Sequence, residues 1–151
     1  MDNDETGREV AEALGDLLKR GTRAGLYRGL TQGLGAAVDE VTYPVLSALA
    51  RTGPYSAADL ATEVGLDRSG VSRRATRLEE AGLVRREPDP ADRRSVLLTL
   101  TEEGARTVEV MRARLAARID ASLGGWPPGE AQAFARSLRR FIDQGPFTDP
   151  A

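Results

Sequence analysis

Apolar residues recur at helical spacing along most of the chain. Intervals of three and four place side chains on one face of an α-helix, and they recur among seven apolar positions between residues 6 and 34. Those positions are Val10, Leu14, Leu17, Leu18, Leu26, Leu30 and Leu34. The same spacing predicts a helix within 39–53, a long helix from residue 101 to a break at 124–130, and a last helix around 134–142.

The first predicted helix carries glycine at every fourth position from residue 21 onward. These residues are Gly21, Gly25, Gly29 and Gly33. Each glycine inside a helix costs up to about 1 kcal/mol relative to alanine. Two readings stay open: another helix approaches the backbone closely along this stripe, or the helix is kinked and partly irregular.

Two shorter helices are predicted between residues 56 and 82. Ser56 and Asp59 have the spacing of a capping box, and Gly65 can adopt the left-handed conformation that ends a helix. Asp67 is expected to cap the next helix, which Gly82 ends. Two capped helices joined through a glycine turn are typical of a helix-turn-helix.

The neighbouring helices carry start signals as well. Thr42 is a candidate cap for the helix within 39–53, and Pro44 suits the first turn of that helix. Thr101 is expected to cap the long helix, whose first turn holds Glu102 and Glu103.

Two strand-like runs follow the helix-turn-helix. They are "LVRREP" at 83–88 and "SVLLTL" at 95–100, and Val96, Leu98 and Leu100 alternate with the residues between them. Such alternation is typical of a half-buried strand. The polar loop between the runs makes them a β-hairpin, or wing. The predicted fold is mainly α-helical with a small β-hairpin wing, and the winged helix-turn-helix occupies residues 41–100.

Charge is distributed unevenly along the chain. The protein of 151 residues has a net charge of −2, and Lys19 is its one lysine among 21 basic residues. Residues 68–94 contain eight arginines and five acidic residues, so this segment is locally basic, with a charge of +3. A basic face on an acidic protein is typical of a protein that binds a polyanion.

The second helix of the pair carries side chains of the types that contact DNA in DNA-binding proteins. Its inward side is predicted to be Val71, Ala75 and Leu78. Hydroxyl groups and guanidinium groups bind phosphates and base edges, and this helix carries several away from that side. The predicted DNA-binding residues are Arg68, Ser69, Ser72, Arg73 and Arg77. The alternative is an ordinary solvated charged face.

The tip of the wing holds Asp92, Arg93 and Arg94. Arginine suits the negative potential of a narrow minor groove, so these residues are predicted to contact DNA. Asp92 would repel phosphate, but it can hold the guanidinium of Arg94 in one rotamer through a charge-assisted hydrogen bond. The alternative is an exposed loop ion pair worth about 0–1 kcal/mol.

Several classes of function find no support in the sequence. The chain has neither cysteine nor histidine, and it shows no nucleophile–base pair, phosphate-binding glycine motif or metal-ligand cluster. No enzymatic activity, cofactor or metal site is expected. No apolar run approaches a transmembrane length and no secretory signal is visible, so we expect a cytoplasmic protein. A winged helix used for protein–protein contact, or a sensor without DNA binding, is the alternative to a DNA-binding regulator.

Residues 66–104, "LDRSGVSRRATRLEEAGLVRREPDPADRRSVLLTLTEEG", resemble the winged helix-turn-helix of MarR family transcription regulators. The "LEEAGLVRR" junction, the "DRR" wing tip and the "LTLTEEG" exit are the most specific marks. The resemblance implies contacts to double-stranded DNA by Ser72, Arg73 and Arg77 and a wing pair of Asp92 and Arg94. Arg74 stands where many members have an apolar residue, which could alter packing or add a phosphate contact.

The resemblance also implies how the chain assembles and how it is regulated. The segment 1–40 and the helices of 101–151 would form a homodimer, and the dimer would bind a pseudo-palindromic operator as a repressor that a ligand releases. Many members bind a small aromatic or phenolic ligand between the dimer helices and the DNA-binding lobe. Tyr27 and Tyr43 are weak candidates for lining such a pocket, as is Trp126, although aromatic residues at these positions are more often part of the core.

Overall fold

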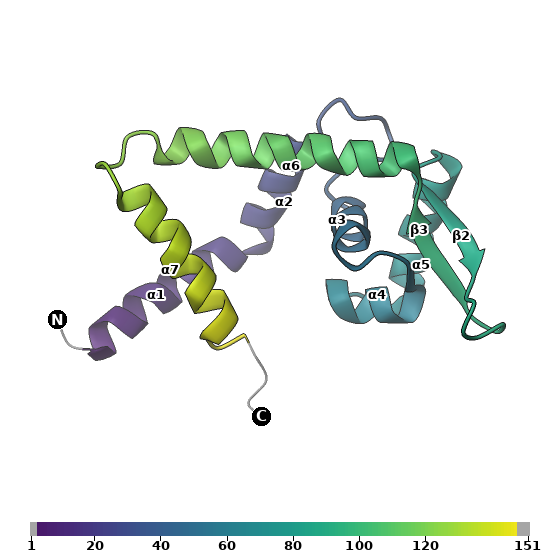
Figure 1. Ribbon diagram of the computed structural model, residues 1–151, viewed down its shortest axis with the longest axis horizontal. Coiled ribbons are helices and arrows are strands. Elements are labelled where there is room, and N and C mark those ends of the chain that lie inside the picture. The colour runs from purple at the N-terminus through teal and green to yellow at the C-terminus, as the bar shows by residue number, and fades with distance from the viewer. Residues whose placement is uncertain (1–2, 148–151) are drawn as a thin grey trace. The chain divides into compact units, whose positions relative to one another are not determined.

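The computed structural model describes residues 3–147 of the chain. Within that range the chain forms seven α-helices and three short strands (Figure 1). In chain order they are α1 (Asn3–Leu18), α2 (Arg20–Thr31), α3 (Tyr43–Thr52), β1 (Tyr55–Ser56), α4 (Ala57–Val64), α5 (Arg68–Glu80), β2 (Val84–Pro88), β3 (Val96–Leu100), α6 (Glu102–Leu123) and α7 (Glu130–Gln144). The chain divides into two compact units, 1–113 and 114–151. The mainly α-helical fold with a small wing is confirmed.

The first predicted helix is two helices. The chain is extended at Lys19, with φ −53° and ψ 134°, and α2 begins at the next residue. Gly33 lies beyond the end of α2 with φ +76°, and no atom lies within 4 Å of where a Cβ of Gly21 would be. Among residues 3–147, therefore, no other helix approaches Gly21 closely, and the interpretation of an interrupted helix is the one observed.

The helix-turn-helix forms as predicted from its caps. The Ser56 hydroxyl accepts the Asp59 N–H at 3.1 Å, and the Asp67 carboxylate accepts the Gly70 N–H at 2.5 Å. Gly65 has φ +68° and ψ +36°. This left-handed conformation is costly for residues with a Cβ, so Gly65 lets the chain turn sharply from α4 toward α5.

Thr42 occupies the N-cap position of α3, as predicted, but its side chain makes no capping hydrogen bond to the helix. Thr42 is fully buried and its hydroxyl donates to the carbonyl of Ala37 at 2.6 Å. The other partners of this hydroxyl all belong to Asp39, whose carboxylate also accepts the Thr42 N–H at 3.0 Å. A buried hydroxyl needs a hydrogen-bond partner, and this one finds it in the preceding loop, at the carbonyl of Ala37.

The wing is part of a three-stranded antiparallel sheet in the order β1-β3-β2. Strands β2 and β3 pair from Val84 with Leu100 to Pro88 with Val96. Strand β1 was not predicted; it pairs Tyr55 with Leu98. The alternation of β3 holds only at Leu98, which is buried between half-buried neighbours, whereas Val96, close to the wing tip, is 50% exposed and Leu100 is half-buried. The wing therefore extends beyond the core.

One hydrophobic core joins the helix-turn-helix to the sheet. It contains Leu46 of α3, Leu60 of α4, Val71 and Leu78 of α5, and Met111 of α6, all with at most 1% of their surface exposed. The predicted inward side of α5 is confirmed, since Val71, Ala75 and Leu78 are fully buried. Helix α5 and the wing are thus supported by the same packed core.

The second unit contains the end of α6 and all of α7. Helix α7 has no buried residue, and its apolar side chains Phe134, Leu138 and Ile142 are all more than 40% exposed. The ring of Trp126 lies 5.3 Å from that of Phe134. This unit therefore presents an apolar stripe that it does not cover itself.

Candidate nucleic-acid interface

Helix α5 has four kinds of surface besides its ends. One side is buried in the core through Val71, Ala75 and Leu78. One flank faces the wing, the outer face is solvated, and the other flank faces the loop between α2 and α3. The residues predicted to bind DNA are distributed over these last three surfaces, so they do not form one uniform row.

A hollow of about 360 Å³ separates the wing flank of α5 from the wing. Arg68 and Ser72 of α5 line it, together with Arg86 of β2 and Arg94 at the base of the wing loop. Ser56, which caps α4, lies in the same lining. Three arginines from three separate segments of the chain therefore line one concave surface.

Arg86 was not among the predicted site residues. Its guanidinium donates to the Thr76 hydroxyl at 3.2 Å and pairs with Glu79, so it bridges β2 to α5. The sequence held one signal for Arg86. Successive side chains of a strand point to opposite faces, so Arg86 lies on one face of β2 and Arg85 on the other. Only the packing of the strand against α5 decides which of the two arginines lines the hollow.

The outer face of α5 carries Ser69 and Arg73. The Arg73 guanidinium donates to the Ser69 hydroxyl at 3.3 Å, and that hydroxyl donates to the Asp67 carboxylate at 3.2 Å. Hydrogen bonds from the Gly70 N–H and the Ser69 hydroxyl lower the pKa of Asp67. The first turn of α5 is thus held by an ionised cap while Arg73 stays exposed beside it.

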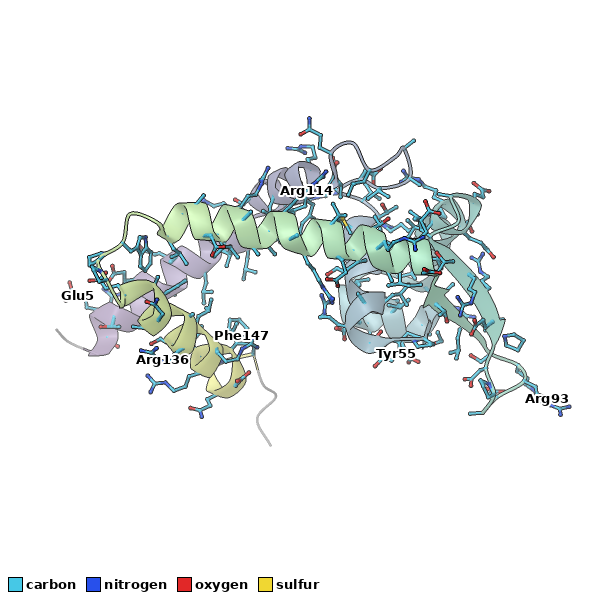
Figure 2. All side chains as sticks on the ribbon, turned by 45° about the horizontal axis from the view of Figure 1, so that its top comes forward. Glu5, Tyr55, Arg93, Arg114, Arg136 and Phe147 are labelled. Atoms are coloured by element: carbon cyan, nitrogen blue, oxygen red, sulfur yellow. The ribbon has the colours of Figure 1, made fainter. Side chains whose placement is uncertain are left out.

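The predicted pairing of Asp92 with the Arg94 guanidinium is wrong. The Asp92 carboxylate accepts the backbone N–H of Arg94 at 3.0 Å, and the Asp92 carbonyl accepts the Ser95 N–H at 2.9 Å. Asp92 therefore shapes the loop backbone, while the Arg94 side chain lines the hollow. Figure 2 shows Arg93 at the tip of the wing, extending into solvent.

The loop flank of α5 carries Arg74 and Arg77, and both are bonded to the loop between α2 and α3. Arg77 forms an ion pair with Asp39 at 2.8 Å, and Arg74 donates to the carbonyl of Val41 at 2.9 Å. Arg74 therefore alters local packing, which was one of its two open readings. Arg77 lies on the flank opposite the basic hollow.

The two tyrosines noted as candidate pocket residues are in contact. The rings of Tyr27 in α2 and Tyr43 in α3 stack with their centroids 4.2 Å apart. Tyr27 also lines a hollow of about 450 Å³ with Arg20, Arg23 and Arg74, whereas Tyr43 does not line it. Glu40 lines it as well, so the hollow combines an aromatic wall with three arginines and one acidic residue. Trp126 belongs to the other unit of the chain.

None of the helices in residues 3–147 is long and apolar enough to cross a membrane.

Comparison with known proteins places this geometry in a family. Residues 36–95 match the MarR family. The HTH-type transcriptional repressor NicR of Pseudomonas putida is 31% identical over 140 residues, which cover 93% of this chain and 89% of NicR.

Solved structures agree with this assignment. The crystal structure of RV1404 from Mycobacterium tuberculosis is 25% identical, with a TM-score of 0.70 over 97% of this chain and 96% of that one. BpsR of Bordetella bronchiseptica, whose DNA binding is regulated by 6-hydroxynicotinic acid, is 29% identical, with a TM-score of 0.61 over 87% of this chain and 99% of that one. The winged helix-turn-helix and the near full-length similarity to NicR together establish that the chain belongs to the MarR family of transcriptional regulators.

Proposed function

We propose that this regulator is a homodimeric repressor that binds a pseudo-palindromic operator and is released by a small aromatic ligand. The observation that carries the DNA-binding part is that Arg68 and Arg94 line one hollow beside α5, together with Arg86, which is paired with Glu79. Arginine neutralises phosphate and grips it through paired N–H groups. The hollow is proposed to hold a backbone phosphate, which sets the position of α5 on the duplex.

With that phosphate in place, the outer face of α5 is proposed to enter the major groove. Ser69 and Arg73 lie on that face and Ser72 on the wing flank beside it, and arginine recognises guanine through two acceptors. Arg93 at the wing tip and Arg94 at its base are proposed to contact the adjacent minor groove and its phosphates. Arg77, bonded to Asp39, is the predicted site residue with the weakest support for a direct contact.

Dimerisation is supported by apolar surface at both ends of the chain. Leu17 and Leu18 of α1 are more than half exposed, and α7 exposes Phe134, Leu138 and Ile142. A monomer seldom leaves extended apolar stripes in water, and symmetric dimers are the commonest way to cover them. We propose that segments 1–40 and 101–151 form this interface, with the winged helix-turn-helix at 41–100 outside it.

The ligand-binding part is supported by the hollow beside Tyr27. Its lining combines that ring with Arg20, Arg23 and Arg74, a set suited to an aromatic compound bearing an acidic group. BpsR responds to a compound of this class, 6-hydroxynicotinic acid. The ligand of this chain is therefore proposed to be a small aromatic acid, with Tyr27 rather than Tyr43 as the lining ring.

Selection of duplexes from a random-sequence library tests the proposed function. We expect the full chain to enrich a sequence with two related half-sites about one helical turn apart, and its affinity to fall steeply with salt. A partner-binding winged helix would enrich no sequence, and its interactions would depend weakly on salt because apolar contacts dominate them.

A further inference from the structure

We propose that Asp39, an acidic residue outside the helix-turn-helix, controls DNA binding as a positioning residue that acts through Arg77. Together with the bond between Arg74 and Val41, this pair would fix the loop flank of the recognition helix α5 to the loop at 36–42. The inference rests on the proposed contact between α5 and DNA. It assigns Arg77 a role different from direct recognition.

Arg77 is bonded twice to the loop. Its Nη2 lies 2.8 Å from Oδ2 of Asp39 and 3.2 Å from the carbonyl oxygen of Ala36. These partners lie 38 and 41 residues away in the sequence, so the contact joins two segments that no helix or strand connects directly. A guanidinium that already serves a carboxylate and a carbonyl has fewer N–H groups left for DNA.

Arg74, one turn earlier on the same flank, adds a second bond to the loop. Its Nε donates to the Val41 carbonyl at 2.9 Å, and its Nη1 donates to the Gly70 carbonyl of its own helix at 2.9 Å. Two attachments three residues apart resist rotation of α5 about its axis better than one attachment does. Rotation about this axis would move Ser69 and Arg73 relative to the groove.

The loop is itself held in a defined shape by the other oxygen of Asp39. That oxygen, Oδ1, accepts the N–H groups of Val41 at 2.9 Å and of Thr42 at 3.0 Å. Burial alone would raise the pKa of Asp39, but the bond from Arg77 and these two N–H groups outweigh it and lower the pKa. Asp39 is therefore ionised at neutral pH. Its Oδ2 pairs with Arg77, and its Oδ1 binds the N–H groups of the loop.

The loop also connects to α2. Arg28 of α2 donates to Glu40 at 3.4 Å, and Glu40, Val41 and Arg74 line the hollow that contains Tyr27. A ligand in that hollow would therefore touch the same loop that holds α5. Binding of the proposed ligand could therefore affect α5 through this loop, because the residues between them are in direct contact.

Removing the charge of Asp39 separates the positioning role from direct DNA contact by Arg77. If Arg77 binds DNA directly, Asp39 competes with phosphate, and Asp39→Asn should tighten binding. If Arg77 positions α5, the same substitution should loosen binding. The asparagine keeps Oδ1 as an acceptor for the loop N–H groups but places an amide NH₂ toward Arg77, so it removes the pair while preserving the loop.

The experiment measures fluorescence anisotropy with a duplex that the parent selects from a random library and with a random duplex of equal length. The variants are Asp39→Asn, Arg77→Ala and the double variant, with Glu63→Gln as control. Glu63 also forms an ion pair, with Arg51 at 3.7 Å, so its substitution changes the net charge equally without touching α5. Thermal unfolding of each variant is followed in parallel.

We expect each single substitution to weaken binding of the selected duplex, on the order of tenfold, with random-duplex affinity and salt slope nearly unchanged. The double variant should lose no more than either single variant, because both break the same contact. Glu63→Gln should match the parent. Loss of sequence preference without loss of general DNA affinity is the signature of a displaced recognition helix.

Several results would overturn the inference. Tighter binding by Asp39→Asn, or a salt slope that drops by about one for Arg77→Ala alone, would show a direct phosphate contact. Additive losses in the double variant would show independent action. The variants could also bind DNA with the affinity of the parent, at a temperature where all of them are folded, and differ only in a lower unfolding temperature. That result would show that the pair between Asp39 and Arg77 is purely structural. Failure of the parent to select any duplex would instead reject the proposed function, and the inference with it.

Discussion

The Asp92 carboxylate is bonded to the main chain of Arg94 and not to its guanidinium: Oδ1 accepts the Arg94 backbone N–H at 3.0 Å. Such a bond fixes the direction in which the following side chain leaves the loop. Arg94 consequently lines the basic hollow beside α5. The acidic residue at the wing thus supports an arginine without neutralising it.

This geometry predicts different effects for two substitutions of Asp92. Asp92→Ala removes the acceptor and should weaken operator binding by about 1 kcal/mol, the typical worth of one hydrogen bond. Asp92→Asn keeps an acceptor oxygen and should bind nearly like the parent. Anisotropy titrations with both variants measure this. Equal tightening by the two variants would mean that Asp92 acts only by repelling phosphate.

A second prediction distinguishes Arg68 in the hollow from Arg73 on the outer face of α5. Arg68→Ala should weaken binding to selected and random duplexes alike and reduce the salt slope by about one, as loss of one phosphate contact does. Arg73→Ala should cost about 1–3 kcal/mol on the selected duplex and relax its sequence preference. Arg51→Ala, an arginine in α3 outside the hollow, is the control. The assignment of the two faces is wrong if the two patterns are exchanged.

Acid should weaken the fold partly through Asp39. Its pKa is lowered from the ordinary value of 3.8 in the folded chain, so its contribution is present above that value and is lost as the pH falls through the folded pKa. Asp39→Asn should therefore lower the free energy of unfolding by roughly 1 kcal/mol at pH 7 and by less at pH 3. Urea unfolding at both pH values measures the difference. A loss that is the same at pH 3 and pH 7 would contradict an ionised partner for Arg77.

The fourth prediction concerns the apolar stripe of α7. Sedimentation at micromolar concentration should give about twice the chain mass of 16.2 kDa, because the stripe needs a partner surface. Leu138→Glu should shift the protein toward the monomer, since a buried unpaired carboxylate is strongly unfavourable. Arg136→Glu changes the charge on the opposite side of the helix and should leave the dimer intact. A parent chain that sediments as a monomer would contradict the dimer.

Local sequence signals were sufficient for the elements of the DNA-binding lobe. Ser56, Asp67 and Thr101 cap their helices through hydrogen bonds spanning three residues. Such bonds depend on few neighbours, so residue type and spacing predict them well. The wing could also be predicted from local signals, because two strand-like runs joined by a short polar loop can pair with each other directly.

The break at Lys19 was a missed local signal. The apolar positions of the first predicted helix are three or four apart until Leu18, and the next one is Leu26. This interval of eight residues is where α1 ends and α2 begins. This longer gap in the apolar stripe indicates a change of direction in the chain.

Only the tertiary structure decided which partners the arginines have. Arg77 meets Asp39 and Arg86 meets Thr76 because separate elements pack on one core, and helical spacing carries no information about residues 38 positions apart. The sequence by itself determined that α5 would be basic, capped and followed by a wing, since those properties depend on neighbouring residues. Which arginines face the hollow and which hold the helix to its loop depends on long-range packing, and so could be learned only from the folded chain.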